Sequence, residues 1–211
     1  MIKNNIRRES YLKFLNTWKN RDLIKVLSGV RRSGKSTLLA MFQQDLKEQG
    51  VQDENIIAIN FEYMEFEELT DYRKLHDYVL SKVDKNKKNY VFLDEIQHVQ
   101  NFEKVVDSLY IRDYIDLYIT GSNAFFLSGE LATLLTGRYI EQHVLPLSFQ
   151  EFKQWHTENN PTIQQLSNRD LYAMYTRSSF PYTLAMTNQQ ETYDYLQAVY
   201  ASVMFRGGSG N

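Results

Sequence analysis

The feature that most constrains this chain is a glycine-containing loop between an apolar run and a second apolar segment. The loop reads Gly29-Val30-Arg31-Arg32-Ser33-Gly34-Lys35-Ser36-Thr37 and matches the pattern G-x-x-x-x-G-K-[ST] in full. The apolar run 23–28 precedes it and the segment 38–42 follows it. Gly29 and Gly34 permit backbone angles and close approaches that other residues resist. The pattern predicts a strand, a phosphate-binding loop and a helix in succession.

Each residue type in this loop suits phosphate chemistry. The loop N–H groups, at the positive end of the following helix, can surround a polyphosphate. Lys35 would reach the β- and γ-phosphate oxygens, and the Ser36 hydroxyl would ligate Mg²⁺. Residues 29–37 are therefore predicted to bind the phosphates of a nucleotide.

A second apolar run ends in two adjacent carboxylates. Asp94 and Glu95 follow the run 90–93, about sixty residues after the loop. Asp94 would orient Mg²⁺ or its water shell, as the corresponding acid does in other enzymes with this loop. Glu95 would polarise the attacking water as a general base. In combination with the loop, the pair predicts a site for nucleotide hydrolysis.

The fourth predicted strand ends in small polar residues. The apolar run that begins at Leu117 leads into Thr120, Ser122 and Asn123. Open α/β sheets bind ligands at the carboxyl ends of their strands, so Asn123, or failing it Ser122 or Thr120, could contact the γ-phosphate or the attacking water. The alternative is a helix N-cap for the segment from Phe125.

Arg138 stands directly before the last predicted strand. It follows Gly137, where the preceding helix is expected to stop. An arginine at this position can reach a nucleotide in its own subunit or in a neighbouring one. An ordinary surface position is the alternative, and the sequence leaves both open.

Strands and helices alternate up to residue 146, and helices follow. The predicted strands cover 23–28, 55–60, 90–95, 117–123 and 139–145, and the predicted helices cover 10–20, 35–49, 71–83 and 102–111. The near-continuous apolar first strand is typical of a sheet covered on both faces. We therefore expect an α/β core with an N-terminal helix over 1–146, a helical lid over 147–206 that a capping box at Ser148 and Glu151 opens, and a linker or truncation tail over 207–211.

Composition excludes several classes of site. The 211 residues include no cysteine, and the four histidines show no metal-ligand spacing. We therefore expect no disulfide, thiolate metal site or cysteine nucleophile. No signal pattern or long apolar run is present, which predicts a soluble, cytoplasmic protein with no membrane partner.

The net charge of −2 conceals a basic N-terminal segment. Residues 1–35 contain ten Lys or Arg and two acidic residues. Such a segment can contact nucleic acid. It can equally form a collar around a phosphate site together with a solvated helix face, which we favour because Arg31, Arg32 and Lys35 already belong to the loop.

Together the motifs resemble one group of prokaryotic AAA-type ATPases over about residues 1–205. The stretches that carry the resemblance are the loop with its strand (24–37), Phe92–Gln97, Thr120–Asn123, Glu130–Thr133 with Leu135–Arg138, and Pro146–Phe152. The resemblance implies a P-loop NTPase fold of the AAA-like, additional-strand type, with a parallel five-stranded sheet in the order 5-1-4-3-2 and a small helical lid. It also implies bound ATP, Glu95 as the catalytic base, Asn123 or a neighbour as γ-phosphate sensor, and a functional role for Arg138.

Members of that group usually continue into a C-terminal domain of poorly defined function. This chain ends soon after 195–204, which resembles the start of that continuation. Ser178 and Ser179 stand where relatives often have two glycines, which affects the expected conformation of that loop and not the ATP site.

The expected function is Mg²⁺-dependent ATP hydrolysis. A switch in which ATP occupancy gates a protein partner or DNA, with little turnover, would use the same residues. A small-molecule kinase is a third possibility, against which Asp94 and Glu95 argue because an activated water suits hydrolysis better. The sequence does not indicate the partner or the oligomeric state.

Overall fold

The computed structural model describes residues 6–121, 135, 137–159, 166–186 and 188–206. Backbone contacts divide the chain into two compact units. One comprises 8–29 and 35–144, and we call it the sheet unit. The other comprises 1–7, 30–34 and 145–211, and we call it the helical unit.

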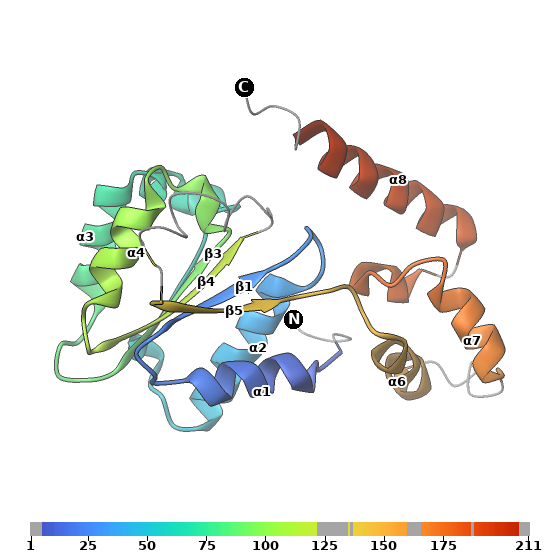
Figure 1. Ribbon diagram of the computed structural model, residues 1–211, viewed down its shortest axis with the longest axis horizontal. Helices are drawn as coiled ribbons and strands as arrows, with labels where there is room; N and C mark the ends of the chain where they lie inside the picture. Colours follow the sequence, from blue (N-terminus) through green and yellow to red (C-terminus); the bar gives the residue numbers. More distant parts are fainter. Residues whose placement is uncertain (1–5, 122–134, 136, 160–165, 187, 207–211) are drawn as a thin grey trace. The chain divides into compact units, whose positions relative to one another are not determined.

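The sheet unit is built on five parallel strands in the order β2-β3-β4-β1-β5 (Figure 1). The strands are β1 (Ile24–Ser28), β2 (Ile56–Asn60), β3 (Asn89–Asp94), β4 (Ile115–Gly121) and β5 (Tyr139–His143). This confirms the predicted parallel sheet and its strand order. All the strands therefore end at one carboxyl edge of the sheet.

Helices cover both faces of this sheet (Figure 1). They are α1 (Glu9–Trp18), α2 (Lys35–Glu48), α3 (Tyr72–Lys82) and α4 (Phe102–Tyr110). Alternate residues of the inner strands enter opposite clusters: Val91 and Leu93 of β3 pack in the cluster of α3 and α4, whereas Tyr90 and Phe92 pack in the cluster of α1 and α2. This alternation is the period-two geometry of a strand buried on both faces.

Local signals set several helix ends. The Asp71 carboxylate accepts hydrogen bonds from the backbone N–H groups of Arg73 and Lys74 at 2.8 and 3.1 Å and caps α3. Gly50 follows α2 with φ of 91°, as expected for a C′ residue. The predicted helix that ends near Gly137 lies mostly outside the described residues.

The helical unit contains three α-helices and a 3₁₀ segment within its described residues. These are α6 (Phe149–Asn159), α7 (Asn168–Tyr175), η6 (Pro181–Ala185) and α8 (Gln189–Arg206). Its core consists of Ile6, Leu147, Phe152, Trp155 and Leu184. The predicted capping box is confirmed: the Ser148 N–H donates to the Glu151 carboxylate at 2.7 Å, and the Glu151 N–H donates to the Ser148 hydroxyl at 3.2 Å.

A buried ion pair joins β1 to β4 on the face that α1 and α2 cover. Lys25 and Asp116 are each 1% exposed, and the Lys25 ammonium donates to the Asp116 carboxylate. The other Asp116 oxygen accepts from the Asn20 N–H and the Tyr118 hydroxyl, both at 2.8 Å. Burial lowers the pKa of Lys25, and Asp116 opposes that shift. The fold therefore requires both partners, because either charge alone would be buried without a counterion.

Removal of the Asp116 charge should strongly destabilise the sheet unit. Asp116→Asn leaves the Lys25 ammonium buried without its partner, and we expect the free energy of unfolding to fall by roughly 3–5 kcal/mol in urea at pH 7. The double variant Lys25→Met with Asp116→Leu should recover most of that loss. Asp113→Asn, at an exposed acid three residues away, is the matched control and should change stability by less than about 0.5 kcal/mol. A loss below about 1 kcal/mol in Asp116→Asn would contradict this role of the pair.

Candidate nucleotide-binding site

Lys35, the first residue of α2, lies beside two acids at the carboxyl edge of the sheet. Its side chain is buried, and Nζ donates to the Gly29 carbonyl at 3.2 Å and lies 3.5 Å from Glu95 Oε1. Burial lowers the pKa of Lys35, while the charges of Glu95 and Asp94 oppose the shift. The fold thus holds a cation at the start of a helix, next to the two carboxylates that end β3.

Asp94, the last residue of β3, is surrounded by hydrogen-bond donors. Its carboxylate accepts from the Ser36 hydroxyl, from the Thr120 hydroxyl and, at 2.9 Å, from Asn60 Nδ2. Burial raises the pKa of Asp94, and the hydroxyls of Thr120 and Ser36 oppose that shift. Ser36 and Asp94 therefore lie within hydrogen-bond reach of each other, as two oxygen ligands of one small cation must.

Glu95 stands outside the strand that was predicted to carry it. It has left-handed backbone angles, φ of 57° and ψ of 47°, which is uncommon for a residue other than glycine. Its N–H donates to Thr120 Oγ1 at 2.9 Å, and its carboxylate accepts from Gln97 Nε2 at 2.6 Å. The turn brings the Glu95 side chain near Lys35. If the strand continued through Glu95, this side chain would point to the face of the sheet opposite that of Asp94.

Thr120 of β4 links the two acids. It is completely buried, accepts the Glu95 N–H through Oγ1 and donates to the Asp94 carboxylate. Sequence reasoning proposed Thr120 only as an alternative γ-phosphate contact and missed the hydrogen bonds of Asn60 and Gln97. The signal for Asn60 was available, because a polar residue that ends β2 lies at the same carboxyl edge as Asp94.

A cleft of about 290 Å³ within the sheet unit opens beside Ser36 and Asp94. Ser36 and Asp94 line it, together with residues of α2, β2 and the segment 63–66. Most of its other walls are apolar, including Leu39, Ile59 and Phe92. The paired oxygens of Ser36 and Asp94 thus face a cleft and are accessible to a ligand.

Gly29, the first residue of the loop, is required by sterics. Its φ is 138°, and a Cβ at this position would lie 2.3 Å from the Val144 carbonyl oxygen. Any other residue would force the backbone after β5 away from the end of β1. The first glycine of the motif is therefore explained by the packing of the sheet unit alone.

The middle of the loop, Val30–Gly34, belongs to the helical unit. The Ser33 N–H donates to the Val30 carbonyl at 3.2 Å, and Arg32 and Gly34 have φ of 67° and 100°. The Arg32 guanidinium carbon lies 5.0 Å from the centre of the Tyr195 ring of α8. Arg32, a predicted phosphate contact, is thus placed on an aromatic ring, and its contact with a nucleotide stays a prediction, as does that of Arg31.

Two further predicted site residues have other placements. Asn123, like Ser122, lies outside the described residues. Arg138 lies at the amino edge of the sheet, where its carbonyl accepts from the Ile24 N–H at 2.8 Å and its side chain pairs with Asp107. About 20 Å of strand separates it from the level of Gly29, so it is not gathered with Lys35 in this sheet unit.

The basic N-terminal segment exposes less charge than its composition suggests. Lys25 and Lys35 are buried among acids of the sheet unit, and Arg8 is 4% exposed with its guanidinium 4.4 Å from the Tyr11 ring centre. Among the bases of this segment that the structure describes, these three are withdrawn from solvent. Within the described residues, no helix is both long and apolar enough to cross a bilayer.

Residues 21–153 match a known family, described as an AAA domain. The chain belongs to this AAA domain family. The chain is 40% identical over 206 residues to an uncharacterized protein of Haemophilus influenzae. The alignment covers 97% of this chain and 50% of that protein, so the chain spans about half the length of this curated relative.

Solved structures share the fold of this AAA domain. The Walker-type ATPase PABY2304 of Pyrococcus abyssi is similar with a TM-score of 0.59 and 16% identity, over 96% of this chain and 74% of that one. AMPPCP-bound DnaA of Aquifex aeolicus is similar with a TM-score of 0.52 and 12% identity, over 100% of this chain and 65% of that one. At these identities the likeness establishes the P-loop ATPase fold.

Removal of the Thr120 hydroxyl should disturb both acids. Thr120→Val leaves the Asp94 carboxylate and the Glu95 N–H each short of a buried partner, and we expect the free energy of unfolding to fall by roughly 1–3 kcal/mol at pH 7. Loss of this donor raises the pKa of Asp94 further above its unfolded value, and ionised Asp94 is the form that is harmed. The deficit should therefore grow as pH rises through the folded pKa, and should be larger at pH 7 than at pH 4.

Thr120→Ser is the matched control, because it keeps the hydroxyl. Urea unfolding of parent and both variants at each pH measures the difference. A Val variant as stable as the parent, or a Val deficit independent of pH, would contradict this role of the Thr120 hydroxyl.

Proposed function

We propose that this AAA domain binds ATP with Mg²⁺ and hydrolyses the bond between the β- and γ-phosphates. The observation that carries the proposal is the convergence of Lys35, Ser36, Asp94 and Glu95 at one carboxyl edge of the sheet. A cation, two oxygen ligands and a second carboxylate are the parts that this reaction needs. Family membership and the shared fold support it.

Loop residues 29–37 bind the triphosphate in this proposal. Their N–H groups and the start of α2 attract the phosphate oxygens. The Lys35 ammonium, held near Glu95, is in place to neutralise charge on the γ-phosphate. The Lys35 side chain would not need a new position in the fold for this step.

Ser36 and Asp94 would hold the Mg²⁺. Their hydrogen-bonded oxygens fit this ion, which is typically bound through one or two carboxylates, waters and substrate phosphates. Within the described residues, no cluster of three or more His, Cys, Asp or Glu that could hold a metal is present, and such a cluster is not what Mg²⁺ with ATP requires. When bound, Mg²⁺ would supply positive charge that offsets the negative charge developing on the phosphate oxygens.

Glu95 accepts the proton of the attacking water in this proposal. Gln97 and the Thr120 hydroxyl orient it through its carboxylate and its N–H, respectively. In the structure the Glu95 carboxylate lies 3.5 Å from Lys35 Nζ. If the Lys35 ammonium moved toward the phosphate, its ion pair with Glu95 would weaken. The Glu95 carboxylate would then bind a proton more readily and be a better base.

Glu95→Gln tests the assignment of the base. The amide cannot accept the proton, so we expect turnover to fall by roughly 10²–10⁴-fold while ATP affinity stays within a few-fold. Steady-state phosphate release and equilibrium binding of a fluorescent ATP analogue measure the two quantities. Glu68→Gln, at an exposed acid that pairs with Lys74, is the control and should behave as the parent. Turnover of Glu95→Gln at the parental rate would refute the assignment.

Metal removal and single-turnover kinetics test the reaction itself. Turnover should vanish in EDTA and return with excess Mg²⁺. The alternative is a switch in which ATP gates a protein or nucleic-acid partner with little turnover. A parent chain that binds ATP but releases no phosphate in a single-turnover experiment, with and without DNA, would favour the switch. Phosphoryl transfer to a metabolite would favour a kinase.

Arg138 is proposed to serve the nucleotide of a neighbouring subunit. Its placement at the amino edge and its partly exposed guanidinium are compatible with that role. Arg138→Ala should then lose hydrolysis, and a mixture with Lys35→Ala chains should regain part of it, because mixed neighbours restore one complete site. Asp107→Asn, which removes the internal partner of Arg138, is the control and should retain activity. Absence of recovery in the mixture would refute the role in trans.

A further inference from the structure

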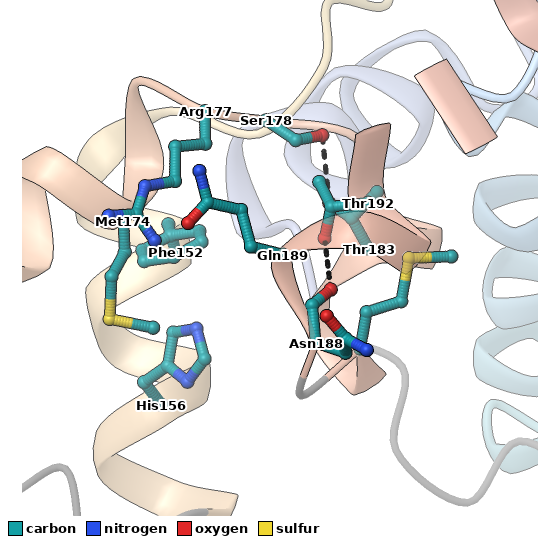
Figure 2. A pocket seen from close by; sticks show the side chains of 10 residues that line it. Phe152, His156, Met174, Arg177, Ser178, Thr183, Asn188, Gln189 and Thr192 are labelled. Carbon is teal, nitrogen blue, oxygen red and sulfur yellow. Dashed lines mark hydrogen bonds between the residues drawn. The ribbon is translucent and has the colours of Figure 1, made fainter. Parts of the chain in front are cut away.

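The helical unit contains a small polar pocket of its own. Its volume is about 80 Å³. Figure 2 shows the side chains of α6 and the end of α7 on one wall, and those of η6 and the start of α8 on the other. The lining residues are Phe152, His156, Met174, Arg177, Ser178, Thr183, Met186, Asn188, Gln189 and Thr192. None of them belongs to the proposed ATP site.

His156 of α6 is buried in this pocket without a partner for one ring nitrogen. The residue is 5% exposed, and Nδ1 has no hydrogen-bond partner. The Phe152 and Trp155 rings lie 4.4 and 5.0 Å from its ring centre and fix the imidazole from two sides. Burial lowers the pKa of His156, so the ring is neutral near pH 7. A buried ring nitrogen normally has a partner, and an occupant of the pocket that His156 lines could supply one.

The rest of the lining offers hydrogen-bond donors and positive charge. Among the described residues that line the pocket, Arg177 is the only charged one and none is a carboxylate. Arg177 and Gln189 are exposed residues, and within the described part of the chain neither side chain is tied up by a hydrogen bond, so both are accessible to a ligand. In Figure 2 the Gln189 side chain extends toward Arg177 and Met174. These groups favour an anion over a cation or a neutral apolar molecule.

The start of α8 adds to this preference. Asn188 caps the helix, with its Oδ1 accepting the Gln190 N–H at 2.9 Å, and Asn188, Gln189 and Thr192 all line the pocket. Because α8 spans 18 residues, its N-terminus carries a substantial positive partial charge. The N-terminus of α8, the Arg177 side chain and the unpartnered Nδ1 of His156 thus all border the same pocket.

We propose that this pocket binds a compact oxyanion, a phosphate or a carboxylate group. Arg177 supplies the charge, Gln189 Nε2 donates a hydrogen bond, and His156 Nδ1, as the N–H tautomer, donates a second. A volume of about 80 Å³ leaves room for a few waters, which suits a group of this size. The site is independent of ATP hydrolysis and adds a second ligand site to the chain.

The test uses the full chain with Lys35→Ala, so that the phosphate-binding loop does not compete for the anion. Ring ¹⁵N-histidine NMR resolves the four imidazoles, and His156→Gln assigns the signal of interest. Titration with sodium phosphate and, separately, with sodium acetate, against sodium chloride at equal ionic strength, should shift the His156 resonance saturably with at least one of the two anions. Arg177→Gln should weaken that affinity roughly tenfold. Arg169→Gln, at an exposed arginine of α7 outside the pocket, should not change it.

The two arms separate the sources of the oxyanion. Saturation with phosphate alone assigns the site to a phosphate group, and saturation with acetate alone assigns it to a carboxylate. A His156 resonance that moves with neither anion would overturn the proposal. So would a shift that chloride reproduces, or one that Arg177→Gln and Arg169→Gln weaken equally.

Discussion

The geometry of the candidate site at the carboxyl edge of the sheet depends on the hydrogen bonds of the Thr120 hydroxyl. This hydroxyl joins the backbone of Glu95 to the carboxylate of Asp94 and thereby ties the ends of β3 and β4 together. Asp94 is in turn tied to β2 through Asn60 and to α2 through Ser36. Four elements from distant parts of the chain are thus fixed around one buried carboxylate. Burial raises the pKa of Asp94 because it disfavours the charged carboxylate. The surrounding hydrogen-bond donors oppose that effect by stabilising the charge.

Most of the sheet unit could be predicted because its information is local and repetitive. Short apolar runs separated by helical segments predict a parallel sheet, and the resemblance supplied the strand order that the structure confirms. The buried ion pair between β1 and β4 is the exception. Lys25 stands inside the apolar run of β1, and its counterion Asp116 is ninety-one residues away. A pattern within one strand contains no information about which residue of another strand neutralises a buried charge.

The site shows the same division between local and distant information. The loop motif specifies Gly29, Lys35 and Ser36 by residue type at fixed spacing, and the apolar run before Asp94 places that acid at the strand end. The left-handed backbone of Glu95 was not predictable, since glutamate has no preference for it. It follows from the surroundings: the Thr120 hydroxyl accepts the Glu95 N–H, and Lys35 attracts its side chain.

The pocket around His156 has no counterpart in any sequence motif, for a physical reason. A phosphate-binding loop uses consecutive backbone groups, so its requirements appear as consecutive residues. The helical pocket collects side chains from α6, the end of α7, η6 and the start of α8, which contribute one or a few residues each. His156 in sequence is one polar residue on an otherwise ordinary amphipathic helix, and Arg177 is one base after another helix. Only tertiary packing gives them a common environment, and it leaves Nδ1 of a buried imidazole in need of a partner.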